Sequence, residues 1–370
     1  MSKCNAWLGG ILVDCAQNHL DVCCGSQWPG NMRKTFSLSQ FEEMQQHRLQ
    51  SWNSSQSQWQ MGCGSCKLSE QIKKESSRHK FNRLVDIAND PIDTSIQQAT
   101  IRTGNICNLK CTMCGPELST KWSSFIVNAD FDNEFSKKYK LKVKQDRTTQ
   151  KEFVDFVKQK VINKNLKRLE FTGGEPLYNK STYEILEYVL QTGFYKNLES
   201  FKVQTNGTTK FNDTMKDFLK HYKGDISISI SADGTHEVFE YIRRDHSWDK
   251  FVDVVSSMKK DLDNRDIDYS LKVAYMLQAI NSKSFIQDIN FYKNWDLLND
   301  SDPFHYDTVH GPEHLSLSSV PDDLKIKWKC PVENFEYNQN LHADMIEYYD
   351  AIDKADSHPS WRNFIPELER

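Results

Sequence analysis

From about residue 96 onward, short apolar runs alternate with longer amphipathic stretches. The short runs predict strands at Gln98–Thr103, Leu166–Thr172, Ser200–Thr205, Asp225–Ser231, Ser270–Leu277 and Phe304–Val309. The longer stretches predict helices around Glu117–Asn128, Lys151–Asn163, Ser181–Thr192, Asn212–Tyr222, Trp248–Leu262 and Ser282–Trp295. Strands that alternate with helices favour parallel β/α units. Because a full eight-stranded barrel takes about 250 residues, this shorter span predicts an α/β fold with a partial (β/α)6 TIM-type barrel.

The segments on either side lack this alternation. The N-terminal patterns predict short strands at Leu8–Val13 and Leu20–Cys24 and helices at Phe41–Leu49 and Gln71–Ile87. The lysine-rich segment Glu134–Lys151 predicts a solvated helix-and-loop insertion, and His342–Ala355 predicts one helix near the C-terminus. We therefore expect a small cysteine-rich N-terminal module at residues 1–90, the β/α core at 91–310, and a C-terminal extension at 311–370 that packs on the barrel.

Composition narrows the class of protein. Lys plus Arg number 47 and Asp plus Glu 51, so the formal net charge is −4 and no basic field indicates nucleic acid or an anionic membrane. No apolar run approaches the ~18 residues that span a bilayer, and the N-terminus is a poor secretory signal. We expect a cytoplasmic protein. Its ten cysteines then indicate metal or redox chemistry rather than structural disulfides.

Three of the cysteines follow the first strand of the predicted core. Cys107, Cys111 and Cys114 have C-x3-C-x2-C spacing within the segment GNICNLKCTMCGP. Three thiolates are one short of closing a tetrahedral metal or cluster site. A cluster held in this way keeps one iron without a protein ligand, so a substrate or cofactor can bind there. The alternative is a zinc or structural cysteine cluster.

Polar, glycine-containing turns follow the next three strands. They are TGGEP at Thr172–Pro176, QTNG at Gln204–Gly207 and SADG at Ser231–Gly234. Glycines allow a tight turn and a close approach of the backbone to a ligand. In β/α barrels the loops after the strands carry the active site. Each turn alone is an ordinary strand ending, but together with the cysteine loop they converge on one rim.

In this order the motifs over Ile101–Val309 resemble the radical S-adenosylmethionine (SAM) superfamily. The resemblance implies that the three cysteines bind three irons of a 4Fe–4S cluster and that SAM occupies the open iron. It implies contacts to SAM from Met113 near the adenine, from Gly173, Gly174 and Glu175 at the amino group, and from Thr205, Asn206, and Ser229 or Ser231 at the ribose or carboxylate. Plain core packing is the alternative for Met113.

The segment SADGTHEVFEYIR resembles the S-x-D-G…R segment of cluster-rich superfamily members. In those members the arginine meets the carboxylate of SAM, and Arg243 matches that position. A guanidinium suits a carboxylate because the two form a bidentate, charge-assisted pair. A surface basic pair with Arg244 is the alternative.

The N-terminal cysteines resemble the SPASM/twitch-type auxiliary-cluster module of radical SAM proteins. The resemblance rests on C-N-A-W at Cys4–Trp7, a doubled cysteine after a short hairpin, and a C-x2-C pair followed by Glu70. It implies a second, auxiliary 4Fe–4S cluster on Cys4, Cys23, Cys63 and Cys66, with Cys23 taken in preference to Cys24. A four-cysteine zinc ribbon is the alternative. Cys15 and Cys330 are expected to be ordinary buried thiols.

The resemblance implies an enzyme. Its reduced cluster cleaves SAM to methionine and a 5′-deoxyadenosyl radical, which abstracts hydrogen from the substrate. We expect a peptide, a protein or a small polar metabolite as substrate, and an electron donor such as flavodoxin or ferredoxin. Nucleic acid and membrane are not expected partners. The alternatives are a zinc-binding, non-catalytic β/α scaffold and a SAM-binding protein without radical turnover.

Overall fold

The computed structural model describes residues 4–16, 19–22, 38–54, 64–71, 76–84, 95–129, 133–139, 150–265, 267–330, 335–355, 360–365 and 367. The chain divides into two compact units. The first comprises Met1–Gly104, Asp146–Val203 and Asn212–Ile226, and the second comprises Asn105–Gln145, Gln204–Phe211 and Ser227–Arg370. Both units combine helices and strands. Among the described residues, no helix has the length and apolar character needed to cross a bilayer.

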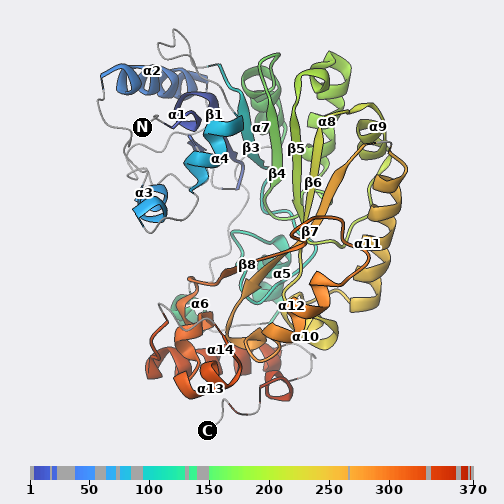
Figure 1. Ribbon diagram of the computed structural model, residues 1–370. Coiled ribbons are helices and arrows are strands. Elements are labelled where there is room, and N and C mark those ends of the chain that lie inside the picture. The colour runs from blue at the N-terminus through green and yellow to red at the C-terminus, as the bar shows by residue number, and fades with distance from the viewer. Residues whose placement is uncertain are drawn as a thin grey trace. The chain divides into compact units, whose positions relative to one another are not determined.

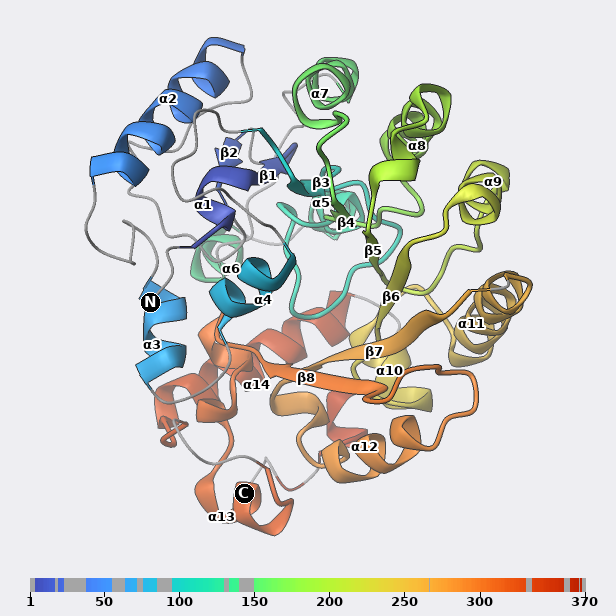
Figure 2. The same ribbon diagram turned by 45° about the horizontal axis from the view of Figure 1, so that its top comes forward.

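The first unit is built on a mostly parallel sheet, whose strands are labelled in Figure 1, except β2, which is labelled in Figure 2. They are β1 Gly10–Asp14, β2 His19–Asp21, β3 Gln98–Arg102, β4 Arg168–Thr172 and β5 Ser200–Thr205, in the order β2-β1-β3-β4-β5. Strand β2 is antiparallel to β1, whereas β1, β3, β4 and β5 are mutually parallel. All residues of β1 are buried, as is usual for a strand inside a parallel sheet.

The helices of the first unit are α1 Ala6–Gly9, α2 Leu38–Ser54, α3 Gly64–Gln71, α4 Ser77–Leu84, α7 Gln150–Phe156, α8 Lys180–Thr192 and α9 Asp213–His221. A π-helical turn at Val157–Val161 extends α7. Helix α8 shows how the local sequence sets the bounds. The Asn179 side chain accepts a hydrogen bond from the Ser181 amide at 3.0 Å, and Gly193 ends the helix with φ 73°.

The second unit contains the strands β6 Asp225–Ser231, β7 Tyr269–Leu277 and β8 Phe304–Thr308, in the order β6-β7-β8. Strands β7 and β8 run parallel and side by side in Figure 2, with Val273 paired to Phe304. The helices are α5 Thr120–Asn128, α6 Asn133–Lys138, α10 His236–Ile242, α11 Trp248–Asp263, α12 Phe285–Lys293, α13 Asp322–Lys327 and α14 Gln339–Ala355. Single 3-10 turns lie at Ala279–Asn281, Glu313–Leu315, Leu317–Ser319 and Trp361–Asn363.

Residues 140–149 of the predicted lysine-rich insertion lie outside the described residues, and the part that is described, up to Tyr139, is only partly solvated. Lys137 in α6 is 72% exposed, as expected of a surface lysine. Tyr139, however, is buried, and its hydroxyl donates to the Asp344 carbonyl of α14 at 2.9 Å. Lys138 forms an ion pair with Asp344 at 3.1 Å. The aromatic residue therefore anchors this segment to α14, a contact that its charge pattern hides.

The predicted α/β class and its β/α units are confirmed. The strands predicted from Gln98 onward correspond to β3 through β8; two of them have the predicted bounds, and the ends of the others differ by at most two residues. The predicted single helix Gln71–Ile87 is wrong at Ser76, which is not helical and precedes α4; residues 72–75 and 85–87 of that prediction lie outside the described residues. The Ser76 hydroxyl accepts the His79 amide at 3.3 Å and so caps a new helix.

The N-terminal strands continue the sheet of the first unit. Strand β1 pairs with β3 in parallel over its whole length, from Gly10 opposite Gln98 to Asp14 opposite Arg102. The sequence predicts the β1–β2 hairpin but gives no sign of this pairing, which joins strands more than 80 residues apart. The division of the chain at residues 90 and 310 stays a prediction.

Candidate active site

The three-cysteine loop follows β3 in the chain and is fastened by the start of α5. The Ser119 side chain caps α5 by accepting from the Lys121 amide, and its hydroxyl donates to the Leu109 carbonyl. The Thr120 hydroxyl donates to the Cys107 carbonyl at 3.2 Å. The fully buried Trp122 donates its indole N–H to the Cys111 carbonyl at 2.8 Å. The loop backbone is thus held by side chains of the helix that follows it.

The thiols of the loop lie together in the second unit. Cys107 and Cys111 are buried with Leu109, and Met113 and Cys114 pack against this cluster. A hydrogen bond from the Cys114 thiol, followed by the charge of Arg243, lowers the pKa of Cys111. Both that hydrogen bond and burial raise the pKa of Cys114. Among the described residues, no three His, Cys, Asp or Glu side chains are gathered into a site for a single metal ion.

Arg243 lies beside the loop, at the C-terminal end of α10. Its Nη1 donates to the Cys111 sulfur at 3.6 Å, and its Nη2 lies 2.6 Å from the Asp233 carboxylate. Asp233 is fully buried, and burial raises the pKa of its carboxyl while Arg243 offsets part of that rise. Burial opposes the charge on Arg243, but Asp233 and Cys111 outweigh it and raise the pKa of Arg243. The alternative of a surface basic pair is wrong, because Arg243 and Arg244 are both buried.

The QTNG turn meets the same loop through Asn206. The Asn206 side-chain amide lies 3.8 Å from the Cys107 sulfur and donates to the Asn108 side chain at 3.0 Å. The Thr205 hydroxyl accepts the Gly207 amide at 3.2 Å and shapes the turn. Gly207 has φ 70°, and a Cβ there would lie 2.6 Å from the Phe251 ring, so this position requires glycine.

The two candidate serines share one face of β6. Residues two apart on a strand point to the same side, so Ser229 and Ser231 project together, opposite the buried isoleucines of the strand. Ser229 is buried, and Ser231 at the end of the strand is half-buried. Their predicted contact with SAM remains a prediction.

The TGGEP turn belongs to the first unit, where it packs on the end of β3. The Gly174 amide donates to the Gly104 carbonyl at 2.7 Å. Glu175 is fully buried, and one of its carboxylate oxygens accepts the Leu177 amide at 2.9 Å. Its contact with the ammonium group of SAM stays a prediction.

Replacement of Gly173 by alanine is expected to destabilise the protein by about 1–3 kcal/mol or more. Gly173 has φ 132°, and a Cβ would lie 3.0 Å from the Gly104 carbonyl oxygen. Urea unfolding measures the loss. Gly193→Ala is the matched control, since Gly193 has φ 73° but no atom within 4 Å of the added Cβ. Equal losses in the two variants would show that the close backbone contact adds nothing to the conformational strain.

The N-terminal cysteines are described only in part. Cys4 is buried beside Ala6 and Phe81, and Cys66 is half-buried on α3. Cys23 and Cys63, like Cys24, lie outside the described residues. Cys15 and Cys330 are buried and belong to no disulfide among the described residues, and burial raises the pKa of Cys330 to about 11.

Arg78 of α4 joins the surroundings of Cys4 and Cys66. It binds Glu70 through two hydrogen bonds, from Nε at 2.9 Å and from Nη2 at 2.5 Å. The pair lowers the pKa of Glu70. The bond to Glu70 raises the pKa of Arg78, and the nearby Cys4 and Cys66 thiols add to that rise. A cation therefore sits close to both described candidate ligands of the auxiliary site.

The C-terminal helix α14 also holds the cysteine loop. The Tyr348 hydroxyl donates to the Thr112 carbonyl at 2.7 Å. The Thr112 hydroxyl in turn donates to the Gln278 side chain at 3.3 Å, just after the end of β7. These contacts place the backbone between Cys111 and Met113 against α14. The sequence gives no signal for them, because Thr112 and Tyr348 stand in unrelated patterns.

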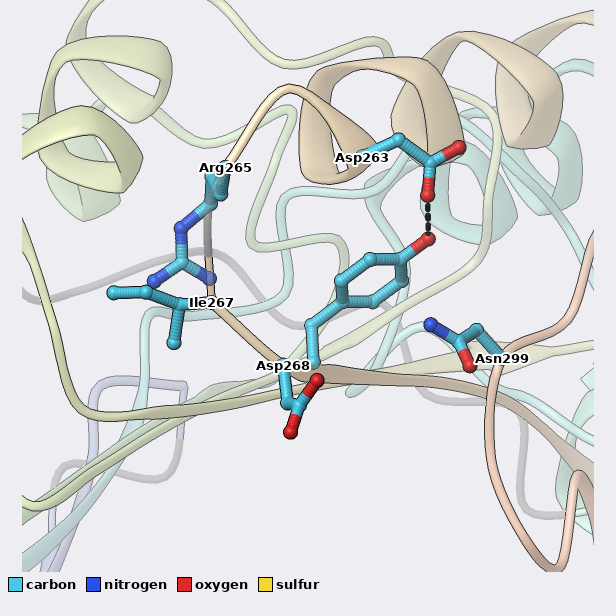
Figure 3. A pocket seen from close by; sticks show the side chains of 6 residues that line it. Asp263, Arg265, Ile267, Asp268 and Asn299 are labelled. Atoms are coloured by element: carbon cyan, nitrogen blue, oxygen red, sulfur yellow. Dashed lines mark hydrogen bonds between the residues drawn. The ribbon is translucent and has the colours of Figure 1, made fainter.

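A hollow of about 550 Å³, drawn in Figure 3, is lined by the first residue of β7 and lies away from the end that Gln278 follows. Its lining residues are Asp263, Arg265, Ile267, Asp268, Tyr269 and Asn299. The Tyr269 hydroxyl, at the start of the strand, donates to Asp263. The cysteine loop contacts the residue after the far end of the same strand. In β/α barrels the chemistry sits at the C-terminal strand ends, so this hollow is not part of the candidate site.

Within the second unit, the structure thus brings Cys107, Cys111, Met113, Cys114, Asn206 and Arg243 to one loop. Sequence reasoning missed Asp233 as a functional residue, although it stands in the SADG motif that drew attention to Arg243. Its signal was a carboxylate at the end of a buried strand, a position that needs a cationic partner.

The chain matches one known protein family and resembles several solved structures. Residues 101–274 match the radical SAM superfamily. Among solved structures, the chain is similar to native anSMEcpe with bound AdoMet, at 16% identity over 69% of this chain and 61% of that chain, with a TM-score of 0.39. It is similar to Streptococcus suis SuiB at 10% identity over 69% of this chain and 46% of that chain, with a TM-score of 0.32. No curated protein gives a significant match.

The chain therefore spans about three-fifths of anSMEcpe and less than half of SuiB. The superfamily match begins within β3 and ends within β7, so it contains the cysteine loop, the TGGEP and QTNG turns and Arg243. It supports a 4Fe–4S cluster and SAM as cofactors. The chain carries a domain of the radical SAM superfamily at residues 101–274.

Proposed function

We propose that this protein is a radical SAM enzyme, which uses a 4Fe–4S cluster to cleave SAM reductively. The observation that carries the proposal is the buried C-x3-C-x2-C loop, with its thiols grouped beside Arg243 inside the matched residues. Members of this superfamily are generally enzymes. When bound, the cluster supplies the electron that breaks the S–C5′ bond of SAM, and the resulting 5′-deoxyadenosyl radical abstracts a hydrogen atom from the substrate.

The donor set of the loop fits such a cluster. Cluster ligands are thiolates, and the Arg243 guanidinium beside the Cys111 sulfur supplies a cation that favours this form. Asn206 and Arg243 direct N–H groups at the Cys107 and Cys111 sulfurs. Hydrogen bonds of this kind orient and tune metal ligands. Cys107, Cys111 and Cys114 would hold three irons and leave the fourth to SAM.

The remaining candidate residues would orient SAM. Glu175 would receive its ammonium group, with Gly173 and Gly174 allowing the close approach. Met113 would pack at the adenine, and Thr205, Asn206, Ser229, Ser231 and Arg243 would contact the ribose or carboxylate. The buried Trp122 would hold the loop backbone in place through its hydrogen bond to the Cys111 carbonyl.

A second, auxiliary 4Fe–4S cluster on Cys4, Cys23, Cys63 and Cys66 is part of the proposal. Its support is the cysteine pattern of the N-terminal segment, in which Cys4 is buried and Cys66 is half-buried. The substrate would be a peptide, a protein or a small polar metabolite, and flavodoxin or ferredoxin would deliver the electron. We place the reaction in the cytoplasm, where thiols stay reduced.

Anaerobic purification with iron, sulfide and zinc analysis tests the proposal. We expect about four irons for the SAM cluster and about eight with the auxiliary cluster. Incubation with SAM and dithionite should then release 5′-deoxyadenosine. Stoichiometric zinc without SAM binding would instead identify a scaffold. A full iron content with no release would identify a SAM-binding protein without radical turnover, and either result would overturn the proposed enzyme.

A further inference from the structure

Asp233 and Arg243 form a buried ion pair, and Arg243 also contacts Cys111 of the cysteine loop. We propose that Asp233 and Arg243 together set the reduction potential of the cluster that the loop would hold, with Arg243 acting on the Cys111 sulfur and Asp233 acting as its positioning residue and counter-charge. The inference rests on the proposed function, because it concerns the same cluster.

The guanidinium is shared between its two partners. Nη1 points at the Cys111 sulfur at 3.6 Å, which is within reach of an N–H···S hydrogen bond. Nη2 points at the Asp233 Oδ2 at 2.6 Å, which is a short, charge-assisted contact. The Arg243 side chain is 9% exposed and that of Asp233 is 0% exposed. Water therefore screens neither interaction well.

The carboxylate is fixed by its own surroundings. The Asp233 Oδ1 accepts the Met276 amide of β7 at 2.7 Å. The Asp233 carbonyl accepts the Asn281 side chain at 3.1 Å. The neighbouring Ala232 amide donates to the Ala274 carbonyl at 3.1 Å. Asp233 is thus pinned to β7, and it holds the guanidinium at a set distance from Cys111.

The sign of each contribution follows from electrostatics. Reduction adds negative charge to a cluster, so a cation and an N–H donor at a ligand sulfur favour the reduced form and raise the potential. A carboxylate close to that cation cancels part of its charge and lowers the potential. The two side chains therefore act in opposite directions on the same sulfur.

This role differs from the predicted contact between Arg243 and the SAM carboxylate. Asp233 already gives the guanidinium a carboxylate partner. A contact to SAM would change the affinity for SAM, whereas a contact to Cys111 changes the cluster when SAM is absent. The midpoint potential of the SAM-free cluster therefore separates the two roles.

The test is a redox titration of the reconstituted full-length protein without SAM, followed by electron paramagnetic resonance. We expect the midpoint potential to fall in R243Q and to rise in D233N. At a fixed solution potential, the ratio of reduced to oxidised cluster should change about tenfold in each variant, which equals about 59 mV for one electron. R243K, which keeps the charge, should lie between wild type and R243Q.

A merely structural role would not shift the midpoint potentials of R243Q and D233N in opposite directions. Potentials that shift in the same direction in D233N and R243Q, or equal wild type, would overturn the inference. If R243Q does not fold, the midpoint potentials of D233N and R243K still test the inference, through the sign and size of their shifts from wild type. A wild-type protein that binds no iron would instead defeat the proposed function, so the two failures are distinguishable.

Discussion

Cys111→Ala is expected to abolish the release of 5′-deoxyadenosine from SAM. Cys111 is the central cysteine of the loop, buried to 4% exposure, with a pKa lowered by Cys114 and Arg243. Loss of a group that merely supports a metal ligand costs about 10–100-fold in affinity or activity. Loss of a ligand itself should therefore reduce release by more than about a hundredfold. Chromatographic assay of 5′-deoxyadenosine after anaerobic reconstitution measures it.

Cys330→Ala is the matched control for this variant. Cys330 is also a buried free thiol of the second unit, and its sulfur lies 3.2 Å from the Ser282 carbonyl. It should keep the wild-type iron content and the wild-type release. Iron analysis of the Cys111 variant should show a loss of about four irons, the content of one 4Fe–4S cluster. Undiminished release from the Cys111 variant would contradict the assignment of the loop.

Asp353→Ala is expected to give the largest loss of stability among substitutions outside the cysteine loop. Asp353 of α14 accepts hydrogen bonds from Arg244 at 3.0 Å and from the Tyr241 hydroxyl at 2.8 Å. Arg244 is completely buried. Removing one partner of a buried ion pair costs about 3–5 kcal/mol. Denaturant unfolding followed by circular dichroism measures the change.

Glu347→Ala provides the comparison on the same helix. Glu347 is 54% exposed and pairs with Lys138, which is 39% exposed. An exposed ion pair contributes about 0.2–1 kcal/mol, so this variant should unfold close to wild type. Similar losses in the two variants would show that the Asp353 contact is not worth more than a surface pair. If Asp353→Ala keeps its stability but loses the iron–sulfur cluster, the substitution would instead act locally on the cysteine loop.

The order of strands and helices could be predicted from the sequence because it rests on local periodicity. Strands such as Ser200–Thr205 and Asp225–Ser231 are bounded by turns that the chain itself encodes. The start of α4 after Ser76 could not be predicted from the sequence. It depends on a serine cap in a segment whose charge pattern is that of a continuous helix. The pairing of β1 with β3 depends on two distant strands that share no pattern.

The candidate site, too, could be predicted from the sequence only in part. The spacing of Cys107, Cys111 and Cys114 predicts the loop, since all three ligands lie within eight residues. The partners of the loop come from α10 and α14 and from the turn after β7. Contacts between side chains so far apart leave no periodic signal. The SADG motif marks Asp233 at the end of a buried strand, but an aspartate in a turn is ordinarily solvated, so the motif alone does not predict its buried ion pair with Arg243.

The contact between Tyr348 and Thr112 has a consequence for how the protein matures. Its two residues are separated by 236 positions. At a synthesis rate of roughly 5–20 residues per second, the cysteine loop leaves the ribosome about 10–50 s before the tyrosine that braces it. Until then the three thiols lie on a loop without its C-terminal support. We expect iron to be loaded after translation of α14, and the thiols to be most vulnerable to oxygen during that interval.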